Sequence, residues 1–345
     1  MPIVKLTDIA RRFGLSVSTI SRALNPTTAH LISEPVRLNI QNLAAKMGYE
    51  SNLRTRRSMD TRSYTLGVVL ATAFHSLFFS DHLTRIFEGI YAVLQKEKRY
   101  GCKLVLLPRE RSLSEIDRYI LSSQVDGLLI STQCDYSVDE LYRLAEHLQS
   151  VSKRPVVAMN LPLKKGSRIS TVSYDNRDAA RRAVMHLLKR GRRHIGLVYA
   201  DNNAEDVRER IEGFKQALSA HGVPLRQKLM ACGDFSTSGG HRATREILKR
   251  KIPCDALFCV NDEMAIGALS AIRVSGKRCP EDIAVMGFDG LAVGEIVHPS
   301  LSTMAQPATE MAALATKLLI DRIEGKRRIA STTMLSAKLI LRDSG

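Results

Sequence analysis

The sequence predicts an α/β protein in which a small all-α unit precedes a larger region built from parallel sheets. Residues 3–49 carry the apolar spacing of three short helices. From residue 64 onward, apolar runs of strand length alternate with helical stretches, which is typical of parallel sheets covered by helices on both faces. A chain of 345 residues is also too long for one compact core, so two or three units are expected.

Residues 5–25 predict two helices joined by a three-residue turn. Thr7 is placed to cap the first helix and Gly14 to end it, and Ser16 then caps the second helix. Apolar residues recur at helical spacing in both segments and should face a shared core. These inward residues are Ile9, Ala10, Phe13, Ile20 and Leu24.

The second helix exposes a face suited to DNA. Ser18, Arg22 and Asn25 recur at helical spacing, with Val17 and Ser21 beside them. A short helix that presents small polar groups and one Arg fits the base edges in a major groove. The alternative is an ordinary amphipathic helix pair, and the agreement of caps, turn and apolar stripe favours DNA binding.

The charge distribution supports the same interpretation. The formal net charge is +16, and the first 63 residues hold ten Lys and Arg against four Asp and Glu. A basic N-terminal module suits a polyanion such as DNA. The positive charge of the remaining chain is spread out and indicates a solvated surface.

The sequence predicts a cytoplasmic protein that needs no membrane, metal or cofactor. Six cysteines are scattered without a Cys-x-x-Cys pair, as expected for buried thiols in a reducing compartment. The N-terminus lacks an apolar signal segment, and no run approaches the roughly 18 apolar residues that span a bilayer. Nine histidines are dispersed along the chain, so no metal cluster is expected.

A third helix and a linker complete the N-terminal part. Ser33 is placed to cap this helix and Gly48 to end it, with apolar residues at helical spacing between them. Residues 50–63 are polar and rich in Arg, which indicates a linker. Asn52 is placed to cap one short helix within it, over about residues 53–59.

The larger region is predicted to form two blocks of strands and helices, centred on residues 65–160 and 170–290. The expected strands are Thr65–Leu70, Lys103–Leu107, Gly127–Ser131, Pro155–Met159, His194–Tyr199, Ala256–Val260 and Ile283–Phe288. The expected helices are Asp81–Glu97, Val138–Gln149, Arg177–Arg190, Asp206–His221, Gly239–Lys249, Asp262–Ser275 and Pro307–Glu324. A strand-like run, Leu335–Leu341, lies near the end of the chain.

Polar and aromatic side chains follow several of these strands. Ligands of open parallel sheets bind at the carboxyl ends of the strands, so these side chains are candidates for one site. Carboxylates, amides and an Arg hydrogen-bond hydroxyl groups, and aromatic rings cover the apolar side of a ring. The set favours a sugar, a nucleoside or a similar polar molecule. Its members are Phe78, Phe79, Asn160, Arg210, Phe235, Asn261 and Asp289.

Several of these residues also have a purely structural interpretation. Asn261 is placed to cap the helix that follows it. Phe78 and Phe79 are equally suited to a core, and Asp289 to a turn. Their convergence on strand ends favours the ligand site.

The whole set of segments resembles the LacI/GalR family of bacterial transcriptional repressors, over residues 3–343. The matching motifs include Leu6-Thr7-Asp8-Ile9-Ala10, Gly14-Leu15-Ser16, Ser18-Thr19-Ile20-Ser21-Arg22-Ala23-Leu24-Asn25, Met47-Gly48-Tyr49, Arg210-Ile211-Glu212-Gly213-Phe214, Asn261-Asp262-Glu263-Met264-Ala265 and Val285-Met286-Gly287-Phe288-Asp289. The resemblance implies a helix-turn-helix headpiece at 1–49, a hinge at 50–63, and a two-lobed periplasmic-binding-protein-like domain at 64–345. The implied first lobe is about 64–162 plus 292–322, and the second about 163–291 plus 323–343.

The resemblance also implies site residues. In the hinge, the side chain that wedges between base steps is Ser58 in strict register, or Met59 if one residue is inserted. The implied DNA-binding residues are Leu6, Thr7, Ser16, Val17, Ser18, Ser21, Arg22, Asn25, Arg56 and Met59. The ligand positions of the family fall on Ala71, Phe79, Asn160, Arg210, Phe235, Asn261 and Asp289, with Phe78 added from its place after a strand.

These observations predict a DNA-binding repressor that acts as a homodimer on a near-palindromic operator. A small polar effector, a sugar or sugar derivative, would control operator affinity by closing the cleft between the lobes. A transport-type solute-binding protein is the alternative, but it would carry a secretion signal and no headpiece. An enzyme is disfavoured because the sequence has no phosphate loop, nucleophile elbow or zinc motif.

Overall fold

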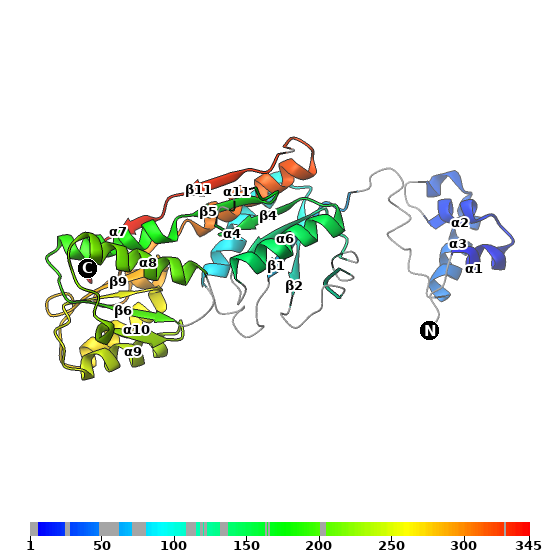
Figure 1. Cartoon of the computed structure of the whole chain (residues 1–345). Coiled ribbons are helices and arrows are strands. Elements are labelled where there is room, and N and C mark those ends of the chain that lie inside the picture. The colour runs from blue at the N-terminus through cyan, green and yellow to red at the C-terminus, as the bar shows by residue number, and fades with distance from the viewer. Residues whose placement is uncertain are drawn as a thin grey trace. The chain divides into compact units, whose positions relative to one another are not determined.

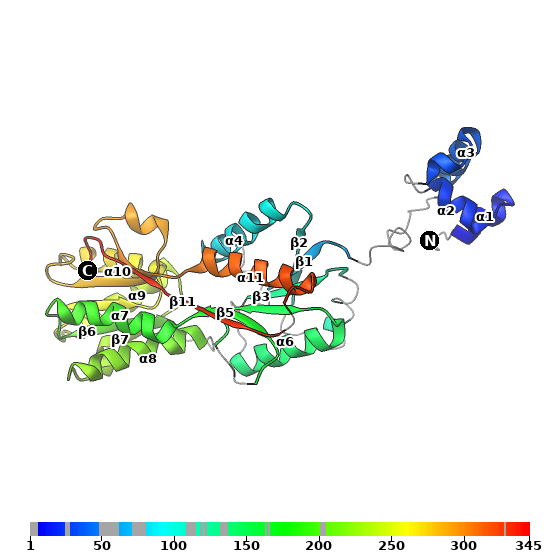
Figure 2. The ribbon, with the colours of Figure 1, turned by 90° about the horizontal axis from the view of Figure 1, so that it is seen from above.

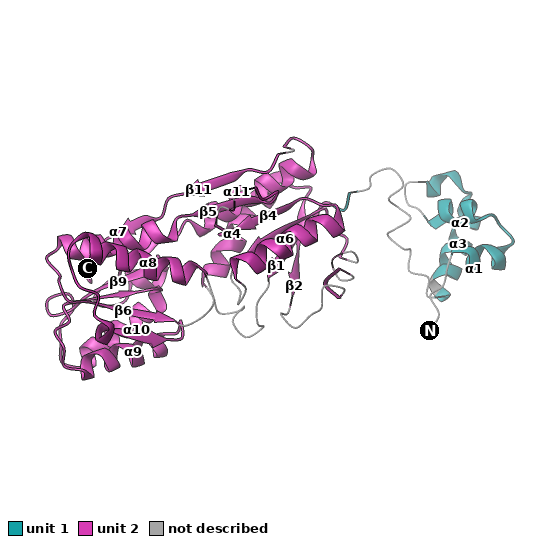
Figure 3. Ribbon diagram, viewed as in Figure 1, with its two compact units in different colours: residues 1–63 teal, residues 64–345 magenta. Residues whose placement is uncertain are grey.

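The computed structural model describes two compact units, Met1–Ser63 and Tyr64–Gly345 (Figures 1 and 3). The described residues are 6–24, 28–47, 62–70, 81–107, 115–117, 120, 123–131, 137–162, 164, 166–200, 205–327 and 329–345. None of the helices in these ranges combines the length and apolarity that crossing a lipid bilayer requires.

The smaller unit is all-α, as predicted. It consists of α1 (Leu6–Phe13), α2 (Val17–Leu24), the short 3-10 helix η1 (Ala29–Leu31) and α3 (Glu34–Lys46). The three α-helices share one apolar core, because their inward residues recur at helical spacing. The buried core residues are Ile9, Ala10, Ile20, Ala23, Ile40 and Ala44.

The turn between α1 and α2 has the predicted chemistry, with one correction. Gly14 adopts a left-handed φ of 64°, and the N–H of Leu15 donates to the carbonyl of Ala10, which closes the end of α1. Ser16 Oγ accepts the N–H of Thr19 at 3.1 Å and so caps α2. Thr7 is not the N-cap of α1, because it lies inside the helix, which already includes Leu6.

The described residues of the larger unit form two six-stranded sheets. The first has the order β11-β5-β4-β3-β1-β2 and is parallel throughout. The second has the order β12-β10-β9-β8-β6-β7, in which β12 runs antiparallel to β10 and the other neighbouring pairs are parallel. The strands are β1 (Thr65–Leu70), β2 (Gly101–Leu106), β3 (Gly127–Ser131), β4 (Val156–Met159), β5 (Ser170–Tyr174), β6 (Ile195–Ala200), β7 (Met230–Gly233), β8 (Ala256–Cys259), β9 (Ala284–Asp289), β10 (Ser302–Ala305), β11 (Thr332–Leu335) and β12 (Lys338–Ile340).

Helices cover both faces of each sheet, as the alternating pattern predicts. In the first sheet, α4 and α11 lie against one face and α6 against the other (Figure 2). In the second sheet, α7 packs on α8, and α9 packs on α10. These helices are α4 (Asp81–Glu97), α6 (Val138–Ser152), α7 (Asn176–Lys189), α8 (Glu205–Ala220), α9 (Thr237–Lys249), α10 (Asp262–Val274) and α11 (Ala308–Ile323), with the 3-10 turns η4 (Gln227–Leu229) and η5 (Ala292–Glu295).

The predicted lobe boundaries are wrong in three places. β5 belongs to the first sheet, where Ser170 pairs with Val157. β10 belongs to the second sheet, where Thr303 pairs with Gly287. The strand-like run at the C-terminus is two strands, of which β11 returns to the first sheet and β12 joins the second. The chain therefore passes between the sheets after β5, after β10 and after β11.

These crossing strands were missed because they are short and rich in Ser and Thr. Ser170, Thr171, Ser302 and Thr303 are all almost fully buried, which a search for continuous apolar runs does not anticipate. Their hydroxyl groups are satisfied within the fold: Ser302 Oγ, for example, donates to the carbonyl of Arg342 at 3.0 Å. Hydrogen bonding thus replaces the apolar pattern at the junction between the sheets.

Candidate functional site

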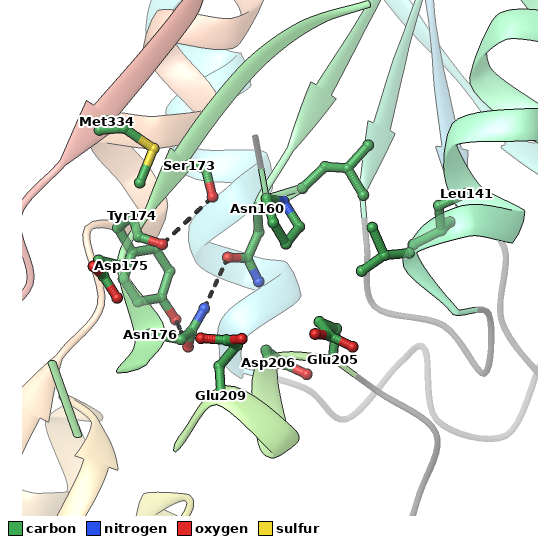
Figure 4. A pocket seen from close by; sticks show the side chains of 13 residues that line it. Leu141, Asn160, Ser173, Tyr174, Asp175, Asn176, Glu205, Asp206, Glu209 and Met334 are labelled. Carbon is green, nitrogen blue, oxygen red and sulfur yellow. Dashed lines mark hydrogen bonds between the residues drawn. The ribbon is translucent and has the colours of Figure 1, made fainter. Parts of the chain in front are cut away.

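A pocket of about 150 Å³ lies where the chain crosses from the first sheet to the second (Figure 4). Its apolar wall comes from α6 and the end of β4, and its polar wall from the starts of α7 and α8. The lining residues are Val138, Leu141, Asn160, Leu161, Pro162, Ser173, Tyr174, Asp175, Asn176, Glu205, Asp206, Glu209 and Met334.

Arg210 lies beside this pocket and is only 3% exposed. Its Nε donates to Asn176 Oδ1 at 3.0 Å and its Nη1 to the carbonyl of Val260 at 2.7 Å. Nη2 donates to the Tyr174 hydroxyl at 3.3 Å and to Asp206 Oδ2 at 3.4 Å. The buried guanidinium therefore ties the crossing segment after β5 to α8 and to the end of β8.

Phe288 and Asp289 of β9 also contact the Arg210 guanidinium. Its carbon lies 4.0 Å from the centre of the Phe288 ring, which is a cation–π contact. Asp289 Oδ1 lies 3.6 Å from Arg210 Nη1. The sequence prediction that Arg210 and Asp289 share one site is consistent with this geometry.

Asn160 and Asn176 extend the network to the first sheet. Asn160 follows β4 in a left-handed conformation with φ 56°, and Asn176 Nδ2 donates to its Oδ1 at 3.3 Å. The Tyr174 hydroxyl donates to Asn176 Oδ1 at 2.8 Å, and burial raises the pKa of this hydroxyl, which keeps it a donor. The sequence does not predict Tyr174 and Asn176 as site residues, because β5 lacks the continuous apolar run of the other strands.

Asp289 is held from both sheets. Arg85 of α4 donates to its carbonyl at 3.0 Å and also to the carbonyl of Gly290. Gln306 Nε2 donates to its carboxylate. The residue has a positive φ of 132°, and such strain persists only where surrounding contacts hold it. Burial raises the pKa of the carboxyl group to about 7, although the charge of Arg210 acts in the opposite direction.

His82 is a further side chain near Arg210 whose pKa is shifted. It lies in the first turn of α4, which packs on the first sheet, and it senses the charges of Arg210 and Asp206 on α8. Burial, and then the positive charge of Arg210, lower its pKa to about 4. The imidazole is therefore neutral at physiological pH. No motif marked it, because a lone His on a helix carries no spacing signal.

Asn261 and Phe235 form a separate contact in the second lobe. Asn261 Oδ1 accepts the N–H of Met264 at 3.0 Å, so this residue caps α10, as its structural interpretation expects. Its Nδ2 donates to the carbonyl of Phe235 at 2.9 Å. Neither residue lines the pocket. The other predicted ligand positions, Ala71, Phe78 and Phe79, lie outside the described residues.

In the smaller unit, the residues predicted to read DNA lie mainly on the outer face. Val17, Ser18 and Arg22 are exposed, and Ser21 is half-buried. Ser16 Oγ lies 2.7 Å from Ser18 Oγ, so the two hydroxyl groups are hydrogen-bonded. Thr7 and Ser16 are also exposed. Asn25, Arg56, Ser58 and Met59 lie outside the described residues.

Leu6, which is also among the predicted DNA-binding residues, has a structural role in the smaller unit. Its side chain is half-buried and packs against the core of the smaller unit, beside residues such as Ile9 and Ile20. The apolar spacing of α1 explains this, because Leu6 stands three residues before Ile9 on the same face. Its role as a DNA contact stays a prediction.

The chemistry of the larger site is that of ligand binding. Carboxylates, amides and a buried guanidinium converge beside an apolar wall, which matches the needs of a polar molecule with an apolar face. No group of three His, Cys, Asp or Glu side chains suited to a metal ion occurs within the described ranges.

Comparison with known proteins places the chain among bacterial regulators. The model of the periplasmic binding protein-like domain matches residues 184–345. The HTH-type transcriptional regulator AscG of Escherichia coli K12 is 30% identical over 343 residues, which cover 98% of this chain and 97% of AscG.

Two solved structures show the same architecture. A complex of the transcriptional regulator CelR with cellobiose aligns with a TM-score of 0.72 and 28% identity, covering 99% of this chain and 100% of CelR. A LacI family transcriptional regulator from Enterococcus faecium with bound ribose aligns with a TM-score of 0.68 and 30% identity, over 81% of this chain and 98% of that one.

Proposed function

This chain belongs to the LacI/GalR family of bacterial transcriptional regulators, and we propose that the site around Arg210 binds the effector that controls its affinity for DNA. The protein is a DNA-binding repressor and not an enzyme. It acts as a homodimer on an operator, with a carbohydrate as its effector. Such a regulator works where the DNA is, in the cytoplasm.

The observation that carries the proposal is the position of Arg210 in a network that joins both lobes. Asn160 belongs to the end of a first-lobe strand, and Asp206 and Asp289 belong to the second lobe. Arg210 contacts the two aspartates directly and reaches Asn160 through Asn176. A ligand that exchanges hydrogen bonds with this network binds one lobe arrangement better than another, and this difference is the requirement for control.

Carbohydrate effectors agree with the chemistry of this site. CelR and the Enterococcus faecium regulator were solved with cellobiose and ribose, respectively. Carboxylate and amide groups here can accept or donate to neighbouring hydroxyl groups. Leu141, Leu161 and Met334 offer the apolar surface that the carbon face of a sugar ring needs.

The headpiece supplies the DNA contact in this proposal. Val17, Ser18 and Arg22 face the bases of a major groove, with Thr7, Ser16 and Ser21 near the phosphates. Two copies of α2 in a dimer would enter successive grooves of a near-palindromic operator.

The experiment is a sugar screen on the full chain. DNA fragments selected by the protein from a random library provide the operator, and gel shifts then measure operator affinity with each sugar. We expect one class of sugar to change this affinity and to raise the melting temperature. Asp206→Asn should leave operator binding intact but raise the effector concentration needed at least tenfold. An unaltered effector response in this variant contradicts the assignment of the site.

The matched control is Glu212→Gln. Glu212 lies on the same helix, is half-buried and pairs with Lys215 at 2.6 Å, and it is not among the pocket-lining residues. Its substitution should change neither operator affinity nor the effector response.

A further inference from the structure

We propose that the effector is an uncharged, hydroxyl-rich sugar and that the pocket rejects anionic sugars such as sugar phosphates and uronates. This inference rests on the proposed function and adds the charge class of the ligand. Three features of the described residues carry it: the occupied donors of Arg210, the acids at the helix starts, and the charge balance of the lining.

The first feature is that Arg210 has no N–H group to spare for an anion. A guanidinium carries five N–H donors. Four of them bond Asn176, Val260, Tyr174 and Asp206, at 2.7–3.4 Å. The remaining Nη1 donor faces the Asp289 carboxylate at 3.6 Å. An incoming phosphate or carboxylate would have to displace two resident carboxylates from the same cation.

The second feature concerns the helix N-termini, which are the usual places for a bound anion. Three helices begin at the pocket, and each places its own carboxylate there. Glu140 Oε2 accepts the N–H of Ser137 at 2.7 Å at the start of α6. Asp175 Oδ1 accepts the N–H of Asp178 at 2.8 Å at the start of α7. Asp206 Oδ1 accepts the N–H of Val207 at 3.0 Å in the first turn of α8.

The third feature is the charge of the lining. Among the residues described at the pocket, four are carboxylates and none is Lys, Arg or His. An anion that enters the pocket would lie within a few ångströms of these like charges, and their repulsion weakens its binding even when solvent partly screens it. The four carboxylates are Asp175, Glu205, Asp206 and Glu209.

A neutral ligand fits this balance better than a cation. Three of the four carboxylates already have a cationic partner: Glu209 pairs with Arg177 at 2.6 Å, Asp206 with Arg210 at 3.4 Å, and Glu205 with an exposed Arg at 3.5 Å. They keep lone pairs that can accept hydroxyl protons without needing another positive charge. The apolar wall opposite them favours a ring with few charges.

The test compares sugars that share a ring and differ in charge. The probes are glucose, glucose 6-phosphate, glucuronate and glucosamine, with ribose and ribose 5-phosphate, and galactose and galacturonate. Isothermal titration and operator gel shifts on the full-length chain, at constant ionic strength, give each affinity. In every series that binds, we expect the neutral sugar to bind at least tenfold more tightly than its anionic counterpart.

A substitution tests whether the acids cause this discrimination. Glu205→Gln removes one pocket charge, keeps the shape of the side chain, and should narrow the neutral-to-anionic affinity ratio severalfold. Glu212→Gln, on the same helix but outside the pocket lining, should leave the ratio unchanged.

The other outcomes separate the inference from the proposed function. If a sugar phosphate or a uronate changes the affinity of the protein for its operator and the neutral parent sugar does not, the proposed function stands and this inference is overturned. Tighter binding of glucosamine than of glucose overturns it as well, because the pocket would then select a cation. Failure of every probe, whatever its charge, to alter operator binding or stability overturns both.

Discussion

Replacing Arg210 with Met is the most direct test of the buried network, because it removes the charge and keeps much of the side-chain volume. The substitution removes the cation that faces the Asp206 and Asp289 carboxylates. It also removes the hydrogen bonds that Arg210 donates to Asn176 Oδ1 and to the carbonyl of Val260. Removing one partner of a buried ion pair typically costs about 3–5 kcal/mol. For a unit of this size, about 2 °C is lost per kcal/mol, so the melting temperature should fall by about 6–10 °C.

Calorimetry of the full-length protein at pH 8 and at pH 5.5 is the assay. Because burial raises the pKa of Asp289 to about 7, its carboxyl group is ionised at pH 8 and largely protonated at pH 5.5. The attraction to Arg210 requires the ionised form. The loss caused by Arg210→Met should therefore be larger at pH 8 than at pH 5.5.

Lys215→Met on the same helix is the control for losing a cation. Lys215 forms a partly exposed pair with Glu212 at the protein surface, and surface pairs contribute about 0–1 kcal/mol. If Arg210→Met lowers stability no more than this control does, or lowers it equally at both pH values, the structural account of Arg210 is wrong.

Three further predictions concern other parts of the chain. Arg22 is exposed on α2, so Arg22→Ala should weaken specific operator binding by about 1–3 kcal/mol and leave salt-sensitive non-specific binding unchanged. Gel shifts with operator DNA and random DNA measure both affinities. Unchanged discrimination between the two DNAs would refute the base-reading role of Arg22. The pKa of Asp289 is raised in the folded state, so its contribution to stability is present near pH 4 and is lost as the pH rises towards 7. The difference in unfolding free energy between the natural chain and Asp289→Asn, measured by urea titration, should therefore fall across that interval and level off above it. A difference that rises with pH would contradict the raised pKa. Gly240→Ala would place a Cβ atom 2.2 Å from the carbonyl oxygen of Met264 and force α9 and α10 apart, at a cost of about 1–3 kcal/mol. In the control variant Gly101→Ala, the added Cβ atom meets no atom within 4 Å. Equal melting temperatures for the two variants would contradict this packing.

The headpiece shows how far local signals reach. Gly14 and Ser16 have the predicted conformations, because a left-handed turn and an N-cap depend on residues only a few positions apart. The placement of Thr7 as a cap was wrong, since a helix start can shift by one or two residues without changing its buried face. Leu6 packs against the headpiece core because it stands three residues before Ile9 on the same face of α1.

The site shows where local signals end. Asn160, Arg210 and Asp289 could be selected because they stand at the ends of strands or on a helix beside an apolar stripe. Tyr174, Asn176 and His82 could not, because their roles come from neighbours far away in the sequence. The assignment of β5, β10 and β11 to their sheets was equally inaccessible, since buried Ser and Thr hide the strands from an apolar pattern.

Residue order alone determined the kinds of element, the three-helix start, the alternating strands and helices, and the family, because these depend on periodicity and on short motifs. Folding in three dimensions decided which strands share a sheet, which donors are already occupied, and which acids surround the pocket. Those properties depend on contacts between segments that lie as much as 204 and 205 residues apart, such as Arg85 with Asp289 and with Gly290. No local sequence pattern encodes such long-range contacts. These contacts set both the charge of the pocket and the coupling between the two lobes.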